Sequence, residues 1–146
     1  MAKKHNNPFA ACDGLEPNKT FSILSDKMAL SKTYQELSHT AKYVLQVCKL
    51  CRQYHRKNDC MLDNNPLLFY FNRELQKRYG LKNANTTRKA LCELIQGGFI
   101  DVRENNGHRR TKNVYSFSGK WQIKEKTGKI ELSQAAKTFL QGHKKT

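Results

Sequence analysis

Side chains that can recognise the edges of nucleobases gather in one short polar stretch. Asn can form a paired hydrogen bond with adenine, Arg or Lys can contact the O6 and N7 atoms of guanine, and the methyl group of Thr can meet that of thymine. These residue types recur at Asn83, Asn85, Thr86, Arg88 and Lys89. The stretch is therefore a candidate DNA base-reading site. The alternative is a solvated helix start, where Asn and Thr cap the helix and the cations add solubility.

A basic cluster follows a predicted hairpin turn. Residues 105–107 read Asn-Asn-Gly, a turn signal because Asn and Gly tolerate a positive φ. The basic residues of the cluster are His108, Arg109, Arg110 and Lys112. Such a loop is suited to contact with backbone phosphates or with the narrow minor groove. The alternative is a charged hairpin that stays soluble and avoids pairing at its strand edge.

Three further cations, Arg73, Lys77 and Arg78, precede the polar stretch. They are expected to hold phosphates beside the reading site. Such contacts supply affinity and register rather than sequence choice.

Local signals predict two short helices around these residues. Apolar and aromatic residues at 67–71 favour a short strand, and Asn72 can cap a helix that Gly80 closes. Asn83 or Asn85 can cap the second helix. Its buried stripe is predicted to contain Thr87, Ala90 or Leu91, Leu94 and Ile95, so that the base-reading candidates point outward.

The second helix leads into a predicted hairpin. Gly97-Gly98 ends the helix, residues 99–103 form a strand with alternating faces, and residues 114–118 form the return strand. Residues 119–123 then leave the hairpin, with Trp121 expected in the core, and Gly128 allows a turn.

The flanking segments carry weaker signals. Residues 21–24 favour a short strand, and Ser25 can cap a single helical turn. Ser38 can cap a long amphipathic helix with Ala41, Val44, Leu45, Cys48 and Cys51 on its apolar face. Ser133 can cap a short helix, which is expected to pack on this long helix or to form a dimer contact.

The segment LKNANTTRKALCELIQGGFI, with its element order, resembles the winged helix-turn-helix DNA-binding domains of bacteria, phages and plasmids. An upstream pattern between Phe21 and Leu45 resembles members from mobile elements. The resemblance implies an α+β, mainly helical fold, with a β-hairpin wing and a short extra C-terminal segment. It divides the chain into a loose lead-in (1–19), the winged domain (20–121) and a basic C-terminal extension (122–146).

Composition and charge favour a polyanionic partner. The chain of 146 residues is of single-domain length and has a formal net charge of +15, with 27 Lys and Arg against 12 Asp and Glu. Residues 72–112 alone hold ten Lys or Arg and four Asp or Glu. A membrane surface is the rival polyanion, but the chain lacks an apolar run of 18 residues and an apolar stretch after Lys3-Lys4. We expect a soluble, cytoplasmic protein without membrane contact.

The cysteines allow two interpretations. Cys48, Cys51, His55 and Cys60 approach the spacing of a zinc knuckle, but the interval before the His is one residue short and the loop lacks glycines. Cys48 and Cys51 also fall on the apolar face of the long helix, so core packing is favoured over a metal site. The odd total of five cysteines is typical of reduced thiols in the cytosol.

The sequence favours a binding protein over an enzyme. It contains no Gly-rich phosphate loop and no hydrolase or metalloprotease motif, its five His are scattered, and no cofactor or metal is expected. The predicted function is sequence-specific binding of double-stranded DNA, in transcription regulation or as an accessory factor in replication or transfer (conjugation) of a mobile element such as a plasmid. A homodimer is the usual way for such modules to lengthen their site. The alternatives are a winged domain that docks proteins without reading DNA, and RNA binding, which the absence of an aromatic sheet motif disfavours.

Overall fold

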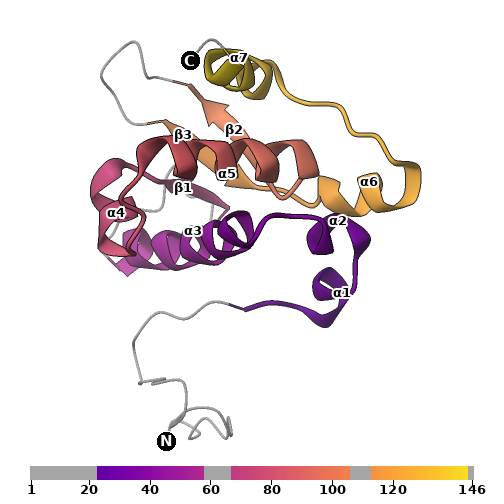
Figure 1. Ribbon diagram of the computed structural model, residues 1–146, viewed down its shortest axis with the longest axis horizontal. Coiled ribbons are helices and arrows are strands. Elements are labelled where there is room, and N and C mark those ends of the chain that lie inside the picture. The colour runs from indigo at the N-terminus through magenta and orange to yellow at the C-terminus, as the bar shows by residue number, and fades with distance from the viewer. Residues whose placement is uncertain (1–22, 58–66, 106–112, 145–146) are drawn as a thin grey trace, which may run out of the picture.

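The computed structural model of the chain describes residues 23–57, 67–105 and 113–144. Within these residues the fold is α+β and mainly helical, with one small antiparallel sheet, which confirms the predicted class (Figure 1). The elements are α1 (Asp26–Ala29), α2 (Lys32–Gln35), α3 (His39–Lys57), β1 (Leu68–Tyr70), α4 (Arg73–Arg78), α5 (Ala84–Gly97), β2 (Ile100–Glu104), β3 (Val114–Phe117), α6 (Lys120–Thr127) and α7 (Gln134–Lys144).

The sheet has the strand order β1-β3-β2, so its middle strand comes last in the chain. Leu68 of β1 pairs with Ser116 of β3, and Ile100 of β2 pairs with Phe117 of β3. The register between β2 and β3 shifts between Val102 and Glu104, at the end of β2 that leads toward the loop of the hairpin. Because β1 precedes the α4–α5 pair and β3 follows it, the sheet joins the chain on both sides of that pair.

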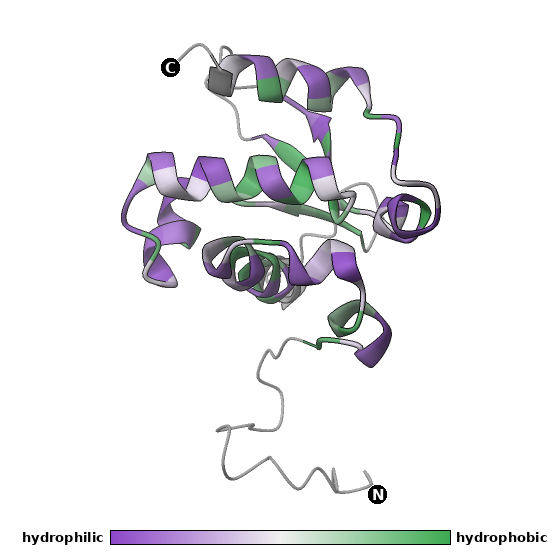
Figure 2. Cartoon of the chain, turned by 45° about the vertical axis from the view of Figure 1, so that its right-hand side comes forward, coloured by the Kyte–Doolittle hydropathy of each residue, from purple (hydrophilic) through white to green (hydrophobic). Residues whose placement is uncertain are grey.

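The long helix α3 forms one wall of the core. Ser38 starts it, since its hydroxyl oxygen accepts a hydrogen bond from the Ala41 backbone N–H at 3.1 Å. Five residues of its apolar face are at most 1 % exposed, which confirms the predicted stripe: Ala41, Val44, Leu45, Cys48 and Cys51. This face packs on α5 and β1, and Figure 2 shows hydrophobic residues concentrated in the sheet and on the inner sides of these helices.

The second core helix, α5, ends at a glycine that no other residue replaces without strain. Gly98 has φ +84° and is the left-handed C-cap, and a Cβ there would lie 2.6 Å from the Trp121 backbone nitrogen. Trp121 is 7 % exposed, and its ring stacks on Phe99 with 5.8 Å between centroids. The predicted core position of Trp121 is therefore confirmed.

The C-terminal elements belong to the same core. The chain after the hairpin forms α6, where the sequence predicts only a turn, so the expected boundary between residues 121 and 122 falls inside a helix. The predicted helix after Ser133 is confirmed as α7, and it packs mainly on β2 and α5, whereas α3 was the expected partner. Its Ala136 and Phe139 are buried in the common hydrophobic cluster.

The N-terminal part of the described chain differs from the prediction in one place. Ser25 caps α1 as expected, because its hydroxyl accepts from the Met28 N–H at 3.1 Å. Ile23 and Leu24, expected in a strand, belong to no strand and are 63 % and 44 % exposed. None of the described helices combines the length and the apolar character needed to cross a membrane.

Candidate nucleic-acid interface

The start of α5 is fixed by Asn83. Its side-chain oxygen accepts a hydrogen bond from the Thr86 N–H at 3.1 Å, and its carbonyl accepts one from the Thr87 hydroxyl at 3.0 Å. Asn83, one of the two predicted caps, is therefore the N-cap. Its side chain therefore positions the helix start.

Three predicted reading residues lie on the outer face of α5. Asn85, Thr86 and Lys89 are exposed, whereas Thr87 and Leu94 on the opposite face are at most 1 % exposed. Packing of the inner face on α3 and β2 holds the helix rigidly, which is what precise recognition of base edges requires.

The acidic residue of α5 is engaged elsewhere. The Glu93 carboxylate accepts hydrogen bonds from the backbone N–H of Ser38 at 3.1 Å and from its hydroxyl at 2.7 Å. This carboxylate thus caps the start of α3, and Lys89 is the charged residue that α5 exposes on its first two turns.

Arg88 does not point outward as the sequence predicts. Its guanidinium donates a hydrogen bond to the Phe139 carbonyl at 3.2 Å, and its central carbon lies 4.4 Å from the centre of the Phe139 ring. A Cβ on Gly142 would come within 3.1 Å of the same guanidinium. The direction of this side chain differs from the expectation because Phe139, its partner on α7, lies 51 residues later in the chain. Arg88 therefore ties α7 to α5 in this arrangement.

Arg73, predicted to hold a phosphate, braces the turn between α4 and α5. Its guanidinium donates to the carbonyl oxygens of Leu81 at 3.3 Å and Lys82 at 2.8 Å, and also to the Gln76 side chain. Gln76 in turn donates to the Phe71 carbonyl at 3.0 Å. These bonds fix how α5 follows α4.

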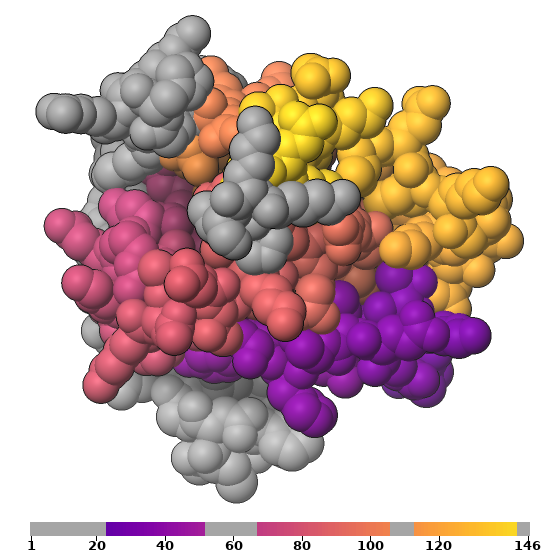
Figure 3. Space-filling model, turned by 45° about the horizontal axis from the view of Figure 1, so that its top comes forward, coloured from indigo at the N-terminus to yellow at the C-terminus, as the bar shows by residue number. Residues whose placement is uncertain are grey.

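Two of the predicted phosphate contacts remain on the surface. Lys77 and Arg78, in the last turn of α4, are exposed, and so is Lys82 in the turn before α5. On the face shown in Figure 3, α4, α5 and α7 all contribute to the surface. Lys77, Arg78 and Lys82 directly precede the first turns of α5 in the chain.

The basic hairpin tip lies outside the described residues. This holds for His108, Arg109, Arg110 and Lys112, whose role stays a prediction. The strands that carry the tip, β2 and β3, are described up to Asn105 and from Asn113.

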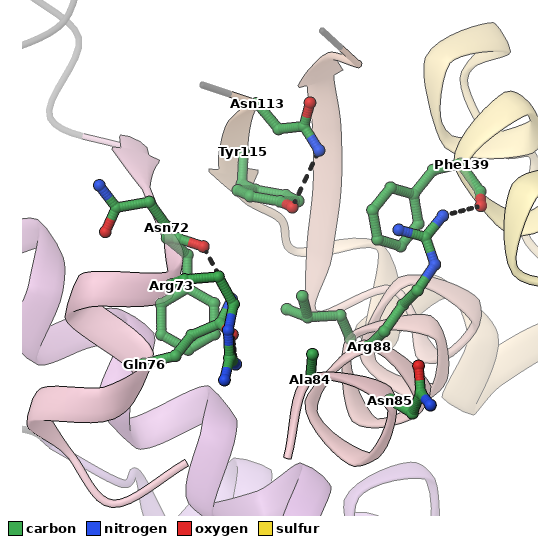
Figure 4. A pocket seen from close by; sticks show the side chains of 11 residues that line it. Asn72, Arg73, Gln76, Ala84, Asn85, Arg88, Asn113, Tyr115 and Phe139 are labelled. Atoms are coloured by element: carbon green, nitrogen blue, oxygen red, sulfur yellow. Dashed lines mark hydrogen bonds between the residues drawn. The ribbon is translucent and has the colours of Figure 1, made fainter. Parts of the chain in front are cut away.

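A hollow of about 280 Å³ opens between α4, the start of α5, β3 and α7. Arg73 and Arg88 stand on opposite walls, and Asn113 and Tyr115 of the β3 region lie between them (Figure 4). The Asn113 amide donates to the Tyr115 hydroxyl at 3.4 Å. Sequence patterns gave no sign of this hollow, because its residues come from four separate elements.

Two of the cysteines of the zinc alternative are core residues. Cys48 and Cys51 are 0 % exposed, which confirms the packing interpretation. Burial raises the pKa of the Cys48 thiol well above its ordinary value, and raises the pKa of Cys51 to about 12. Cys60 lies outside the described residues, as does the side chain of His55.

Comparison of the chain with protein-family models, with curated proteins and with solved structures finds no match. Function is therefore inferred from the chain's own geometry.

Proposed function

We propose that this chain is a winged helix-turn-helix protein that binds double-stranded DNA sequence-specifically and reads it with α5. The observation that carries the proposal is the outer face of α5, where Asn85, Thr86 and Lys89 stand exposed on the first two turns of a helix fixed in the core. In helix-turn-helix docking, these turns of the second helix reach base edges in the major groove.

The order of elements supports the same proposal. The elements follow one another as α3–β1–α4–α5–β2–β3, the order along the chain that the resemblance implies. In this scheme the β2–β3 hairpin is the wing, and its basic tip, Arg109 and Arg110 included, lies along the DNA backbone.

Base and phosphate contacts have separate sources. Asn85 is suited to adenine, Lys89 to guanine, and the methyl group of Thr86 to thymine. Lys77, Arg78 and Lys82 supply phosphate contacts that set register and affinity without selecting a sequence. Arg73 and Arg88 act first on the fold, as their hydrogen bonds to the turn and to α7 indicate.

The biological role follows the resemblance to mobile-element proteins. We place the protein in the cytoplasm, as a transcription regulator or as an accessory factor in replication or conjugative transfer, acting as a homodimer on a two-fold site. The competing function, docking of a partner protein without DNA reading, is favoured by one observation. Leu30 and Ile123, which belong to no reading element, are 68 % and 54 % exposed.

The salt dependence of duplex binding tests the proposal. Double substitution of Lys77 and Lys82 by Ala should make the negative slope of log affinity against log salt shallower by about two, because each lost phosphate contact removes about 0.9 from its magnitude. The matched control removes Lys126 and Lys129, two exposed lysines of α6 and the chain after it, at the other end of the molecule from α4 in Figure 1. Affinity is measured by fluorescence anisotropy on a mixed-sequence duplex.

Equal slopes for the two double variants would remove the α4–α5 turn from the interface. Absence of duplex binding by the unsubstituted protein at low salt would reject DNA binding and favour the docking function.

A further inference from the structure

Two guanidinium groups, those of Arg73 and Arg88, line the hollow beside the start of α5. Arg73 and Arg88 are both half-buried, and among the described residues neither forms an ion pair. Their hydrogen bonds go to neutral carbonyl and amide oxygens. The Nε atom of Arg88 is buried and has no hydrogen-bond partner within the described parts of the chain. Within the described residues, no carboxylate therefore compensates the positive charge on the two walls.

The remaining polar groups of the hollow are neutral. They are the side-chain amides of Asn72, Gln76, Asn85 and Asn113 and the phenol of Tyr115, and no Asp or Glu belongs to the described residues that line the space. Amide and guanidinium N–H groups donate well to the oxygens of an anion, and such charge-assisted bonds are about twice as strong as neutral ones. The chemistry of the walls thus selects for an oxyanion.

The floor of the hollow is apolar. Phe71, Leu91 and Phe139 line it and are at most 3 % exposed. The volume of about 280 Å³ lies at the lower limit of small-ligand sites, which span roughly 300–1,000 Å³. The space therefore suits a compact ligand whose anionic group meets the two arginines and whose body rests on the floor.

We propose that this hollow is a binding site for a phosphate group, held between Arg73 and Arg88. The phosphate belongs either to a small phosphorylated compound or to the DNA backbone. The site itself does not depend on the proposed DNA function, and only the assignment to the backbone rests on it. In either case, occupancy takes place beside Asn85, at the first turn of α5 (Figure 4).

Ala84 offers a substitution that fills the anion position without disturbing the core. It is exposed, it is the first residue of α5, and Figure 4 shows its methyl group directed into the hollow. Ala84→Glu adds a carboxylate to the hollow that Arg73 and Arg88 line, and a carboxylate in the first turn is favourable to the helix dipole. Ala84→Gln is the matched control, with the same shape and no charge.

The direct test is a titration of the unsubstituted protein and both variants with inorganic phosphate and with 2′-deoxyadenosine 5′-monophosphate, against chloride at equal ionic strength. Side-chain N–H resonances of Arg73, Arg88, Asn85 and Asn113 are followed by NMR. Saturable shifts with half-saturation at about 1 mM or tighter are expected for the unsubstituted protein and Ala84→Gln. Ala84→Glu should show none. Absence of shifts in the unsubstituted protein, or equal shifts in Ala84→Glu, would overturn the proposal.

Duplex binding identifies the source of the phosphate. If the backbone enters the hollow, saturating phosphate weakens duplex binding. Ala84→Glu then lowers affinity about eightfold more near 0.1 M salt than does Gln96→Glu, which puts the same charge on the exposed far end of α5, outside both the hollow and the reading turns. If the ligand is a separate compound, phosphate leaves duplex affinity unchanged or raises it. Both results uphold the site. Failure of the DNA function would appear separately, as absence of duplex binding by the unsubstituted protein.

Discussion

Replacing Phe139 by Ala tests whether α7 is part of the cooperative fold. Phe139 is 1 % exposed, its ring meets Tyr115 edge-on at 6.1 Å between centroids, and the guanidinium carbon of Arg88 lies 4.4 Å from the centre of the same ring. A buried Phe→Ala change costs about 3–5 kcal/mol, which includes the cavity that remains. The aromatic pair and the cation–π contact place this site in the upper part of that range.

Urea unfolding followed by tryptophan fluorescence measures this cost. Trp121 is the only Trp of the chain, and it lies in α6 and packs on Phe99, away from the substituted site. With a slope of about 2 kcal/mol per molar urea, the midpoint should fall by roughly 2 M. Lys137→Ala, on the exposed side of α7, is the control and should change stability by less than about 0.5 kcal/mol.

A different result would refute this account of α7. If far-UV circular dichroism shows loss of helix in Phe139→Ala while the Trp121 midpoint stays unchanged, α7 is an appendage that undocks locally. The tie between Arg88 and α7 would then contribute nothing to the stability of α5.

Two further predictions concern the contacts of α6. Gly98→Ala should destabilise the protein by about 2 kcal/mol or more, because it adds a close contact with the Trp121 backbone to the strain of a positive φ. The control Gly128→Ala, at φ +78° in open space, should cost only about 1 kcal/mol. Equal losses of stability in urea unfolding would argue against the close contact at Gly98. Hydrogen bonds from the Thr33 hydroxyl, the Thr33 N–H and the Lys32 N–H lower the pKa of Glu125 from its ordinary value of 4.5. The contribution of Glu125 to the stability of the fold is therefore complete above about pH 4.5, and it is lost as the pH falls through the lower pKa of the folded state. Glu125→Ala should therefore flatten the acid side of the stability profile measured by thermal unfolding, and an unchanged acid side would contradict this role.

Local signals in the sequence predicted the elements that surround α5. Asn72 caps α4, Asn83 caps α5, and Gly98 ends α5, because each of these residues acts on backbone groups within a few positions of itself. The buried cysteines of α3 were also predictable, since they share the helical spacing of Val44 and Leu45.

Contacts between distant segments were not predictable in the same way. The position of Arg88 at the start of a helix predicts an exposed side chain, because nothing near it in the sequence indicates the contact with Phe139 of α7. In α6 only Trp121 is buried, so this segment lacks the apolar stripe that would predict an amphipathic helix. Ile23 and Leu24 have the composition of a strand, but no strand of the sheet pairs with them.

Selection of bound fragments from a random duplex pool tests the central claim most directly. The account predicts one enriched sequence, with two-fold symmetry if the protein acts as a dimer. Asn85→Ala and Lys89→Ala should each narrow the free-energy gap between that sequence and random DNA by about 1–3 kcal/mol, while Gln96→Ala, exposed at the far end of α5, should leave it unchanged. A pool that shows no enrichment, or an equal loss of affinity on every sequence in the first two variants, would contradict base reading by α5.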